Sequence, residues 1–379
     1  MFRFLSISAL LLLTNTRTAA HQKPYFKPTK NYIFPSTSID GIARIDTKIG
    51  NQALDRPYIT RHNSSSYEWW YFDAISSDGQ SSIVITSFVS PLDTYENQSG
   101  LQLLVQIVSP QGGLYDDTIE YDKDEKLYIS TKGDTSNGIL NNGDFSWIGK
   151  SDLSEYTLNL NLPKYNISGT INLFSLAKPF VGCGPAQKDA NTSIFWFFNW
   201  INVIGDAVAV VDIAVGDQKV AFTGNGYHDK NWGPVSFIPY VHHWYWGHGR
   251  VGEYSVVWSK MFLNDNTTKA GGWISKNDKI ILSACFENDD SVVIKPLGNN
   301  ITDPPKKANN THNIQGFDIT INTGNEQGIF QFQLKKNIRI NGELGTYARW
   351  IGNFTGGQLG EEDSQIGVAV TEQMGPFVF

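Results

Sequence analysis

Hydrophobic and polar residues alternate along most of this chain. Segments such as "SSIVITSFVS", "YTLNLNL", "KIILSACFE" and "IFQFQLKKNIRI" are short, rich in β-branched and aromatic residues, and have a period of two. They are separated by polar stretches with turn chemistry, such as "SSDG", "NNGD" and "NTGNEQG". No helical stripe extends beyond about three turns. The pattern therefore predicts an antiparallel all-β protein, built as a barrel or a sandwich.

The 379 residues are enough for two domains or one large β unit. Pro234 and Pro239 interrupt strand propensity in "NWGPVSFIPYVHHW" and indicate a boundary there. We therefore expect an N-terminal β domain over residues 66–235 and a C-terminal β domain over residues 236–379. Residues 21–65 are polar and irregular, and we expect them to form an arm over the first domain.

The first twenty residues have the anatomy of a secretory signal peptide. A basic residue, Arg3, precedes an apolar run from Phe4 to Leu13, and small residues lead up to a cleavage site after Ala20. We therefore expect the protein in the secretory pathway or outside the cell. Eight acceptors for N-glycosylation agree with this: Asn63, Asn97, Asn166, Asn191, Asn266, Asn300, Asn309 and Asn353.

The composition is acidic and rich in aromatic residues. Removal of the first twenty residues lowers Lys and Arg from 30 to 28 against 37 Asp and Glu, so the net charge falls from −7 to about −9. This charge disfavours nucleic acid and anionic membrane surfaces as partners. The apolar stretch over residues 194–215 mimics a membrane span, but Asn199, Asp206 and Asp212 interrupt it. Two buried strands with a turn at Gly205-Asp206 fit it better.

Cys183 and Cys285 are the two cysteines of the chain, so one intramolecular pairing is open to them. In an oxidising compartment such a bridge is worth about 2–4 kcal/mol. Two buried free thiols are the alternative, and the sequence leaves both open.

The stretch "SYEWWYFDAIS", residues 66–76, places four consecutive aromatic residues between two acids. An acid against aromatic walls is desolvated, which raises its pKa and suits it to proton donation. The other interpretation is a core strand whose acids pair with an arginine or cap a turn. If the stretch is a strand, one face carries Tyr67, Trp69, Tyr71 and Asp73, and the other carries Glu68, Trp70 and Phe72.

A second group of polar residues lies in "GNGYHDKNWGPVSF", residues 224–237. On a strand, Tyr227 and Asp229 share one face and His228 lies on the other. A phenol beside a carboxyl forms a candidate proton relay. The alternative is a turn rich in Gly and Asn, in which the Asp closes an Asx turn.

A third group lies in "HHWYWGHGRVGEYSVVW" and includes Arg250. His242, Trp244 and Trp246 share one parity on a strand, opposite His243 and Tyr245. The histidine spacing matches no common zinc motif, so we predict no metal site. "GHGRVG" matches a dinucleotide fingerprint, but the residues after it, "EYSVVWSKMFL", have the pattern of a strand instead of a helix, and the motif is rejected.

The pairing of "EWWYFDA" with "GNGYHDKNWGP" resembles the superfamily of carotenoid 1,2-hydratase (hydroxyneurosporene synthase) and AttH-like proteins. "HHWYWGHGRVGEYSVVW" and "YARWIGNFTGG" are similar to the second lipocalin-like domain of that superfamily, and the resemblance covers most of residues 60–379. It implies two lipocalin-like β domains with a ligand cavity at or near their interface.

Within the superfamily, carotenoid hydratases protonate an alkene and add water, and Tyr227 and Asp229 match their Tyr-x-Asp motif. Fungal members include Diels–Alderases, and some relatives dehydrate tropolonic sesquiterpenes to a quinone methide and guide its hetero-Diels–Alder capture. The signal peptide and the acceptor sites favour a fungal member. The resemblance therefore implies a (hetero-)Diels–Alderase of fungal secondary metabolism that needs no cofactor and takes a hydrophobic small molecule as its partner.

Two sets of residues are predicted to form the site. Glu68, Asp73, Tyr227, Asp229 and Arg250 are the catalytic candidates, because they can protonate, hydrogen-bond or polarise a substrate oxygen. A hydratase or isomerase, a non-catalytic carrier and a secreted glycosidase with paired acids remain as alternatives. The residues predicted to bind substrate are Trp70, Tyr71, His228, Trp232, His242, Trp244, Trp246, Trp258 and Trp350.

Overall fold

The computed structural model describes residues 29–35, 41–89, 100–287, 291–304, 313–324, 327–343, 347–361 and 365–375. In these ranges the chain forms strands and two short 3-10 helices, η1 (Asn141–Gly143) and η2 (Pro163–Tyr165), and no α-helix. The predicted all-β class is therefore confirmed. No helix of the described segments is long and apolar enough to cross a membrane.

Parts of the secretory prediction fall outside the described residues. They are the signal peptide at residues 1–20 and the acceptors Asn97 and Asn309.

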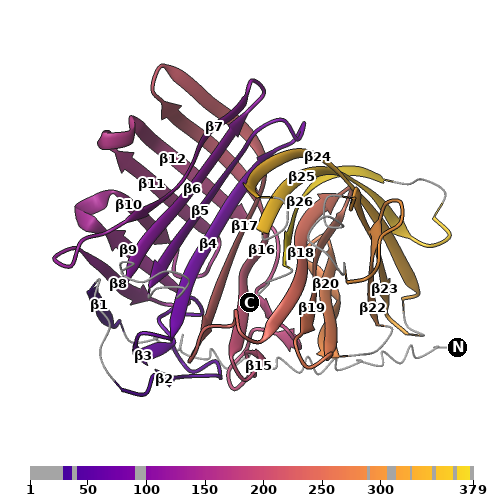
Figure 1. Cartoon of the computed structure of the whole chain (residues 1–379), viewed down its shortest axis with the longest axis horizontal. Helices are drawn as coiled ribbons and strands as arrows, with labels where there is room; N and C mark the ends of the chain where they lie inside the picture. The colour runs from indigo at the N-terminus through magenta and orange to yellow at the C-terminus, as the bar shows by residue number, and fades with distance from the viewer. Residues whose placement is uncertain are drawn as a thin grey trace, which may run out of the picture.

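The first domain is one large sheet that curls into a half-barrel on the left of Figure 1. β13 (Phe180–Val181), β14 (Gly184–Pro185) and β15 (Ser193–Phe195) attach beside its middle, and β2 (Arg44–Ile45) pairs separately with β3 (Ile59–Arg61). In spatial order the main path of the sheet is β1 (Asn31–Pro35), β8 (Lys126–Lys132), β9 (Thr135–Leu140), β10 (Phe145–Gly149), β11 (Glu155–Leu162), β12 (Ile167–Ser175), β16 (Phe198–Val215), β17 (Gln218–Gly233), β4 (Tyr67–Ser76), β5 (Ser82–Val89), β6 (Leu101–Ser109) and β7 (Gly112–Glu120).

The second domain is a nine-stranded antiparallel sheet, on the right of Figure 1. The end strand β22 approaches β19 and β20, so the sheet is a nearly closed barrel. Its spatial order is β21 (Lys279–Glu287), β20 (Thr268–Lys276), β19 (Tyr254–Leu263), β18 (Val241–Val251), β26 (Gln365–Met374), β25 (Tyr347–Gln358), β24 (Ile329–Glu343), β23 (Gly316–Asn322) and β22 (Val292–Leu297). The connection between the two sheets holds Pro234 and Pro239.

The segment before β4 differs from the arm that the sequence pattern predicts. β1 is an edge strand of the first sheet, and Ile49, Leu54 and Tyr58 are buried in the core of the first domain. These apolar residues are few and irregularly spaced among polar ones, so they show no period. The segment is therefore part of the domain and does not merely lie over it.

β16 corrects the turn predicted at Gly205-Asp206. The strand continues through both residues, and only its register with β17 shifts there. A side chain at Gly205 would meet the ring of Phe180 at 2.7 Å, and the carboxylate of Asp206 is bound by Arg250 from the second domain. The polar break thus marks an irregularity in a long strand that faces the other domain.

Apolar side chains gather in three clusters, one inside each domain and one between them. The inter-domain cluster draws side chains from both sheets, because β4, β16 and β17 face β18, β19 and β26 across it. Its aromatic members include Trp69, Tyr71, Phe198, Trp200, Tyr227, Phe237, Trp244, Trp246 and Trp273.

A disulfide joins Cys183 to Cys285 across 102 residues of sequence, and so decides between the two alternatives that the sequence left open. Cys183 lies between β13 and β14 of the first domain, whereas Cys285 lies in β21 of the second. The bond therefore ties the two domains together beside the inter-domain cluster.

We expect the double substitution Cys183→Ser and Cys285→Ser to lower the free energy of unfolding by about 2–4 kcal/mol, because the bond closes a long loop and limits the unfolded chain. Urea unfolding measures the loss, and the unsubstituted protein in excess reductant is the control. Two reactive thiols per molecule in the denatured, unreduced protein would show that the bond is absent.

Candidate active site between the domains

The site is built on the pairing of β4 with β17, in which Asp73 lies opposite Tyr227 and Tyr71 lies opposite Asp229. Side chains alternate between the two faces of a strand. Tyr71 and Tyr227 belong to the inter-domain cluster, while Trp70 belongs to the core of the first domain. The division of each strand into two faces, predicted from parity, is therefore confirmed.

A cavity of about 240 Å³ lies between the domains. Its apolar wall is mostly aromatic, and its polar lining is confined to a few groups from both sheets. The aromatic and aliphatic wall residues are Trp69, Tyr71, Phe88, Leu104, Phe198, Trp200, Phe237, Trp244, Trp246, Met261 and Met374. The polar residues are Thr86, Asp229, Asn231, Ser259, Tyr347, Arg349 and Glu372.

Asp229 is buried in the cavity wall and is bound by neutral groups. The indole Nε1–H of Trp200 donates to its Oδ2 at 2.7 Å, and the Nδ2–H of Asn231 donates to its Oδ1 at 2.8 Å. Burial raises the pKa of Asp229 to about 7; hydrogen bonds oppose this rise, and the charge of Glu372 adds to it. A group with this pKa can both give and take a proton near neutral pH.

The hydroxyl of Tyr227 contacts both Asp229 and Asn202. Its oxygen lies 3.0 Å from Oδ2 of Asp229 and also contacts Oδ1 of Asn202. The hydroxyl is placed to donate to Asp229, and this hydrogen bond lowers the pKa of the carboxyl, as the one from Trp200 does. Burial outweighs these hydrogen bonds, so the pKa stays at about 7.

Asp73 lies behind the cavity wall and links the two domains. The hydroxyl of Tyr71 donates to Oδ2 of Asp73 at 2.6 Å, and Nε2 of His248 on β18 lies 2.7 Å from the same oxygen. The ring of His248 stacks on Tyr227, with centroids 4.3 Å apart. Asp73 does not line the cavity, so its place is that of a residue that positions Tyr71 and His248.

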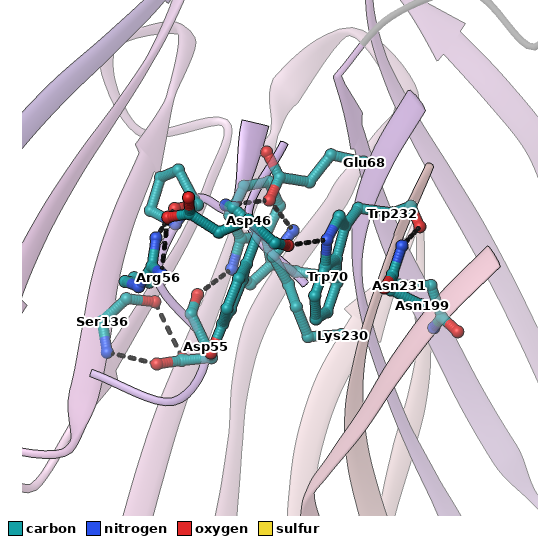
Figure 2. A network of polar contacts seen from close by, with 12 residues as sticks. Asp46, Asp55, Arg56, Glu68, Trp70, Ser136, Asn199, Lys230, Asn231 and Trp232 are labelled. Carbon is teal, nitrogen blue, oxygen red and sulfur yellow. Dashed lines mark hydrogen bonds and ion pairs between the residues drawn. The ribbon is translucent and has the colours of Figure 1, made fainter. Parts of the chain in front are cut away.

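Glu68 lies on the opposite face of β4, inside the first domain, and has a charged partner. Lys230 Nζ lies 2.7 Å from its Oε1, and the backbone N–H of Tyr58 donates to the same oxygen at 2.6 Å. Figure 2 shows this group, in which the ammonium of Lys230 also lies 3.4 Å from the ring centroid of Trp70. Burial raises the pKa of Glu68, but Lys230 and His62 outweigh it, so the pKa lies below its ordinary value.

The alternation that places Glu68 inside the first domain also moves three predicted substrate-binding residues away from the cavity. Trp70 donates its indole N–H to the backbone oxygen of Asp55, and Trp232 stacks on Tyr58. His228 packs against Phe72 with ring centroids 4.0 Å apart. These side chains fill the core of the first domain, which corrects their predicted place at the cavity.

Four predicted residues of the second domain also lie outside the cavity. Trp258 stacks on Phe354 in the core of the barrel, and Trp350 lies under the ammonium of Lys336 at 3.5 Å. His242 contacts the neighbouring His243, and Arg250 holds Asp206 through two hydrogen bonds of 2.7 and 2.6 Å. Of the predicted residues, Tyr71, Asp229, Trp244 and Trp246 line the cavity, with Tyr227 directly behind Asp229.

Several cavity residues were not identified from the sequence. Trp69 lies in "SYEWWYFDAIS", and Trp200 lies in the stretch that mimics a membrane span. Arg349 and Tyr347 belong to "YARW", where their charge and hydroxyl have no partner nearby in sequence. Their partner, Glu372, lies on another strand, and only the β25–β26 pairing brings them together. Among the described residues, no group of three or more His, Cys, Asp or Glu has the arrangement of a metal site.

The sequence of this chain is similar to a described family and to several curated proteins. A family model described as Diels-Alderase-like matches residues 42–375. The quinolone epoxide rearrangement protein asqO of Emericella nidulans is 30% identical over 344 residues, which are 90% of this chain and 92% of that protein. The Diels-Alderase cheD of Chaetomium globosum is 19% identical over 65% of this chain and 60% of its own.

A solved structure shares the fold. The crystal structure of CghA with Sch210972 superposes with a TM-score of 0.75 at 16% identity, covering 91% of this chain and 98% of that one.

The raised pKa of Asp229 predicts how stability depends on pH. The folded protein favours the neutral carboxyl, so the contribution of this group is present below pH of about 4 and is lost as the pH rises through about 7. The free energy of unfolding of Asp229→Asn, relative to that of the wild type, should therefore be higher at pH 8 than at pH 5. Urea unfolding at both pH values measures the difference.

Asp152→Asn is the matched control, because Asp152 is exposed and a hydrogen bond from Ser154 lowers the pKa of its carboxyl. Its variant should show no difference between pH 5 and pH 8, because this carboxyl is ionised in both the folded and the unfolded protein above a pH of about 4. Equal responses of the wild type and Asp229→Asn to pH would contradict a buried neutral carboxyl.

Proposed function

This chain belongs to the Diels-Alderase-like family, and we propose on that premise that its inter-domain cavity holds an apolar substrate whose reacting oxygen is protonated by Asp229. The protein is an enzyme of the Diels–Alderase type, a cyclase of fungal secondary metabolism. The observation that carries the proposal is a carboxyl buried in the wall of an aromatic cavity, whose pKa burial raises to about 7.

The aromatic wall supports the cyclisation step. A cycloaddition needs little covalent help, and holding its two reacting parts in a near-attack geometry can remove about 7–11 kcal/mol of barrier in good intramolecular cases. Trp69, Trp244 and Trp246 are rigid, and the sheets behind them fix their positions. Such walls select one folded shape of a flexible substrate, and therefore one stereochemical outcome.

The acid supports the step that makes the reactive species. Asp229 gives its proton to an epoxide or hydroxyl oxygen, and the C–O bond breaks with its electron pair going to that oxygen. A hydroxyl leaves as water, whereas an epoxide oxygen stays attached as a hydroxyl. The hydroxyl of Tyr227 contacts Asp229 and Asn202 on the side away from the cavity, and so helps to fix the orientation of the Asp229 carboxyl.

Two classes of substrate suit this chemistry. The relative that is 30% identical is named for the rearrangement of a quinolone epoxide, which carries a strained oxygen. A tropolonic sesquiterpenoid that loses water to a quinone methide is the other class. A polyene lies outside these two classes, because it needs no acid and would depend on the aromatic wall alone. The hydratase, isomerase and carrier alternatives are not favoured, since the relatives are named as Diels–Alderases and a rearrangement protein.

We also propose passage through the secretory pathway with N-glycosylation. Of the acceptors that the structure describes, Asn63 is half-buried and its amide donates to the backbone oxygen of Gly41 at 2.8 Å. The others are exposed and open to an oligosaccharyltransferase: Asn166, Asn191, Asn266, Asn300 and Asn353.

Asp229→Asn should lower kcat by about 10²- to 10⁴-fold on an epoxide or hydroxyl substrate, because Asn cannot supply the proton. The wild-type rate should fall about tenfold per pH unit above 7, as the acid form is lost. Product formation by chromatography over pH 5–9 measures both effects.

Asp206→Asn, which lies outside the cavity, is the control for the loss of a buried acid. Full activity of Asp229→Asn would contradict the acid role, and incorporation of labelled solvent oxygen into the product would favour a hydratase.

Protein secreted from a eukaryotic host should lose mass on treatment with a peptide N-glycosidase. Site mapping should find glycans on the exposed acceptors and none on Asn63. Protein made in a bacterial cytosol is the control, and an unchanged mass of the secreted protein would contradict the proposal.

A further inference from the structure

A second carboxyl group, Glu372 of β26, lines the same cavity as Asp229. It lies opposite Trp246 of β18 and opposite Arg349 of β25, two residues that also line the cavity. Glu372 and Arg349 are buried, with 8% and 4% of their surfaces exposed. The cavity thus holds one carboxyl from each domain.

The orientation of Glu372 is fixed through one of its two oxygens. Arg349 Nη2–H and the hydroxyl of Tyr347 each donate to Oε2 at 2.9 Å. From the described residues Oε1 accepts no hydrogen bond, and Glu372 lines the cavity, so this is the oxygen that remains open to a substrate. An oxygen with open lone pairs is the acceptor that a substrate O–H or N–H needs.

Arg349 is itself held from the first domain. Its Nη1–H donates to Oε1 of Gln106 at 2.7 Å, and its guanidinium carbon lies 5.0 Å from the ring centroid of Tyr71. The position of the Glu372 carboxylate therefore depends on both domains, as expected for a group that must meet a substrate held between them.

Stability does not explain this ion pair. Burying an arginine and a glutamate has a desolvation cost that their attraction often fails to repay, and apolar residues of similar size commonly serve a fold better. Leu104 and Met374, which line the same cavity, are apolar and show that its wall also accepts such residues. A buried ion pair at the wall of a ligand cavity is therefore better explained by what the ligand requires.

The two carboxyls of the cavity have opposite surroundings. Asp229 is bound by Trp200, Tyr227 and Asn231, none of which is charged, whereas Glu372 is bound by a guanidinium. Uncharged donors around Asp229 suit it to give a proton, and a guanidinium that holds one oxygen of Glu372 suits the other oxygen to meet a substrate proton.

We propose that Glu372 is the catalytic base of the cavity and accepts a proton from a substrate O–H or N–H while Asp229 donates one to the leaving oxygen. This inference rests on the proposed function of the cavity. In a phenol with a neighbouring benzylic hydroxyl, the phenol proton passes to Glu372 and the proton of Asp229 passes to the benzylic oxygen. The benzylic C–O bond breaks, and the products are water and a neutral quinone methide.

An epoxide with a neighbouring N–H follows the same balance without loss of water. The proton of Asp229 passes to the epoxide oxygen and the C–O bond breaks. The N–H group is attached to the opened carbon, so as its proton passes to Glu372 the nitrogen forms a C=N double bond to that carbon. In both reactions one proton leaves the enzyme and one returns to it, and transfer from Glu372 to Asp229 through solvent resets the site. Arg349 is a positioning residue, which fixes the carboxylate and balances its charge.

The test uses two ligands, 1-(hydroxymethyl)-2-naphthol and its 2-methoxy analogue, in which a methyl group replaces the phenol proton. The phenol can donate to Glu372, whereas the methyl ether cannot. Fluorescence titration of the full chain should show about tenfold tighter binding of the naphthol, the difference expected of a hydrogen bond to a charged acceptor. Ethyl vinyl ether as the trap should give a cycloadduct from the naphthol alone.

Glu372→Gln should reduce the binding preference to about twofold or less and lower the rate of cycloadduct formation about 100-fold. The double variant Arg349→Met and Glu372→Met removes both charges together and guards against a folding defect from one unpaired charge. Asp229→Asn should keep the preference while it loses turnover. Asp206→Asn is the matched control, since it breaks another buried carboxylate–arginine pair outside the cavity.

The outcomes separate this inference from the proposed function. An unchanged preference for the naphthol in both Glu372 variants would overturn the role of Glu372, while loss of turnover in Asp229→Asn would leave the proposed function standing. Failure of the wild type to bind either ligand, or to accelerate the cycloaddition, would overturn both. Two results together support both the role of Glu372 and the proposed function. The first is that the Glu372 variants lose the preference for the naphthol while Asp229→Asn keeps it. The second is that Glu372→Gln and Asp229→Asn both lose turnover.

Discussion

The antiparallel pairing of β4 with β17 is the constraint on which the rest of this structure depends. The side chains of each strand alternate between the core of the first domain and the space between the domains, so each strand contributes to both. A slip of one residue would put Lys230 into the cavity and Asp229 into the core of the first domain. The ion pair of Lys230 with Glu68, buried on the inner face, therefore also secures the outer face where Asp229 lies.

Three buried acids show how neighbours decide what a carboxyl does. Glu68 is paired with Lys230 and holds the segment around Tyr58 inside the first domain. Asp229 has uncharged hydrogen-bond partners, and burial brings its pKa to about 7. Glu372 is paired with Arg349 through one oxygen and lines the cavity. The first is structural, and the other two are placed where a substrate can meet them.

The cavity belongs to neither domain alone. Its wall needs Trp69 and Phe198 from the first sheet and Trp244 and Trp246 from the second, and the bond between Cys183 and Cys285 restrains how the two sheets meet. This arrangement allows one fold to serve different reactions, since wall residues can change while the strand pairing persists. The fold is shared with CghA at 16% identity.

By itself the sequence determined the all-β class and, through the period of two, which side chains of β4, β17 and β18 share a face. It also identified Tyr227 and Asp229, because a phenol and a carboxyl two residues apart on a strand must lie side by side. It could not tell which face meets the cavity, since Trp70 and Tyr71 are equally apolar neighbours, nor could it pair Arg349 with Glu372 across 23 residues. Those choices were made by the tertiary structure, because a cavity between two sheets exists only once strands distant in sequence have packed against each other.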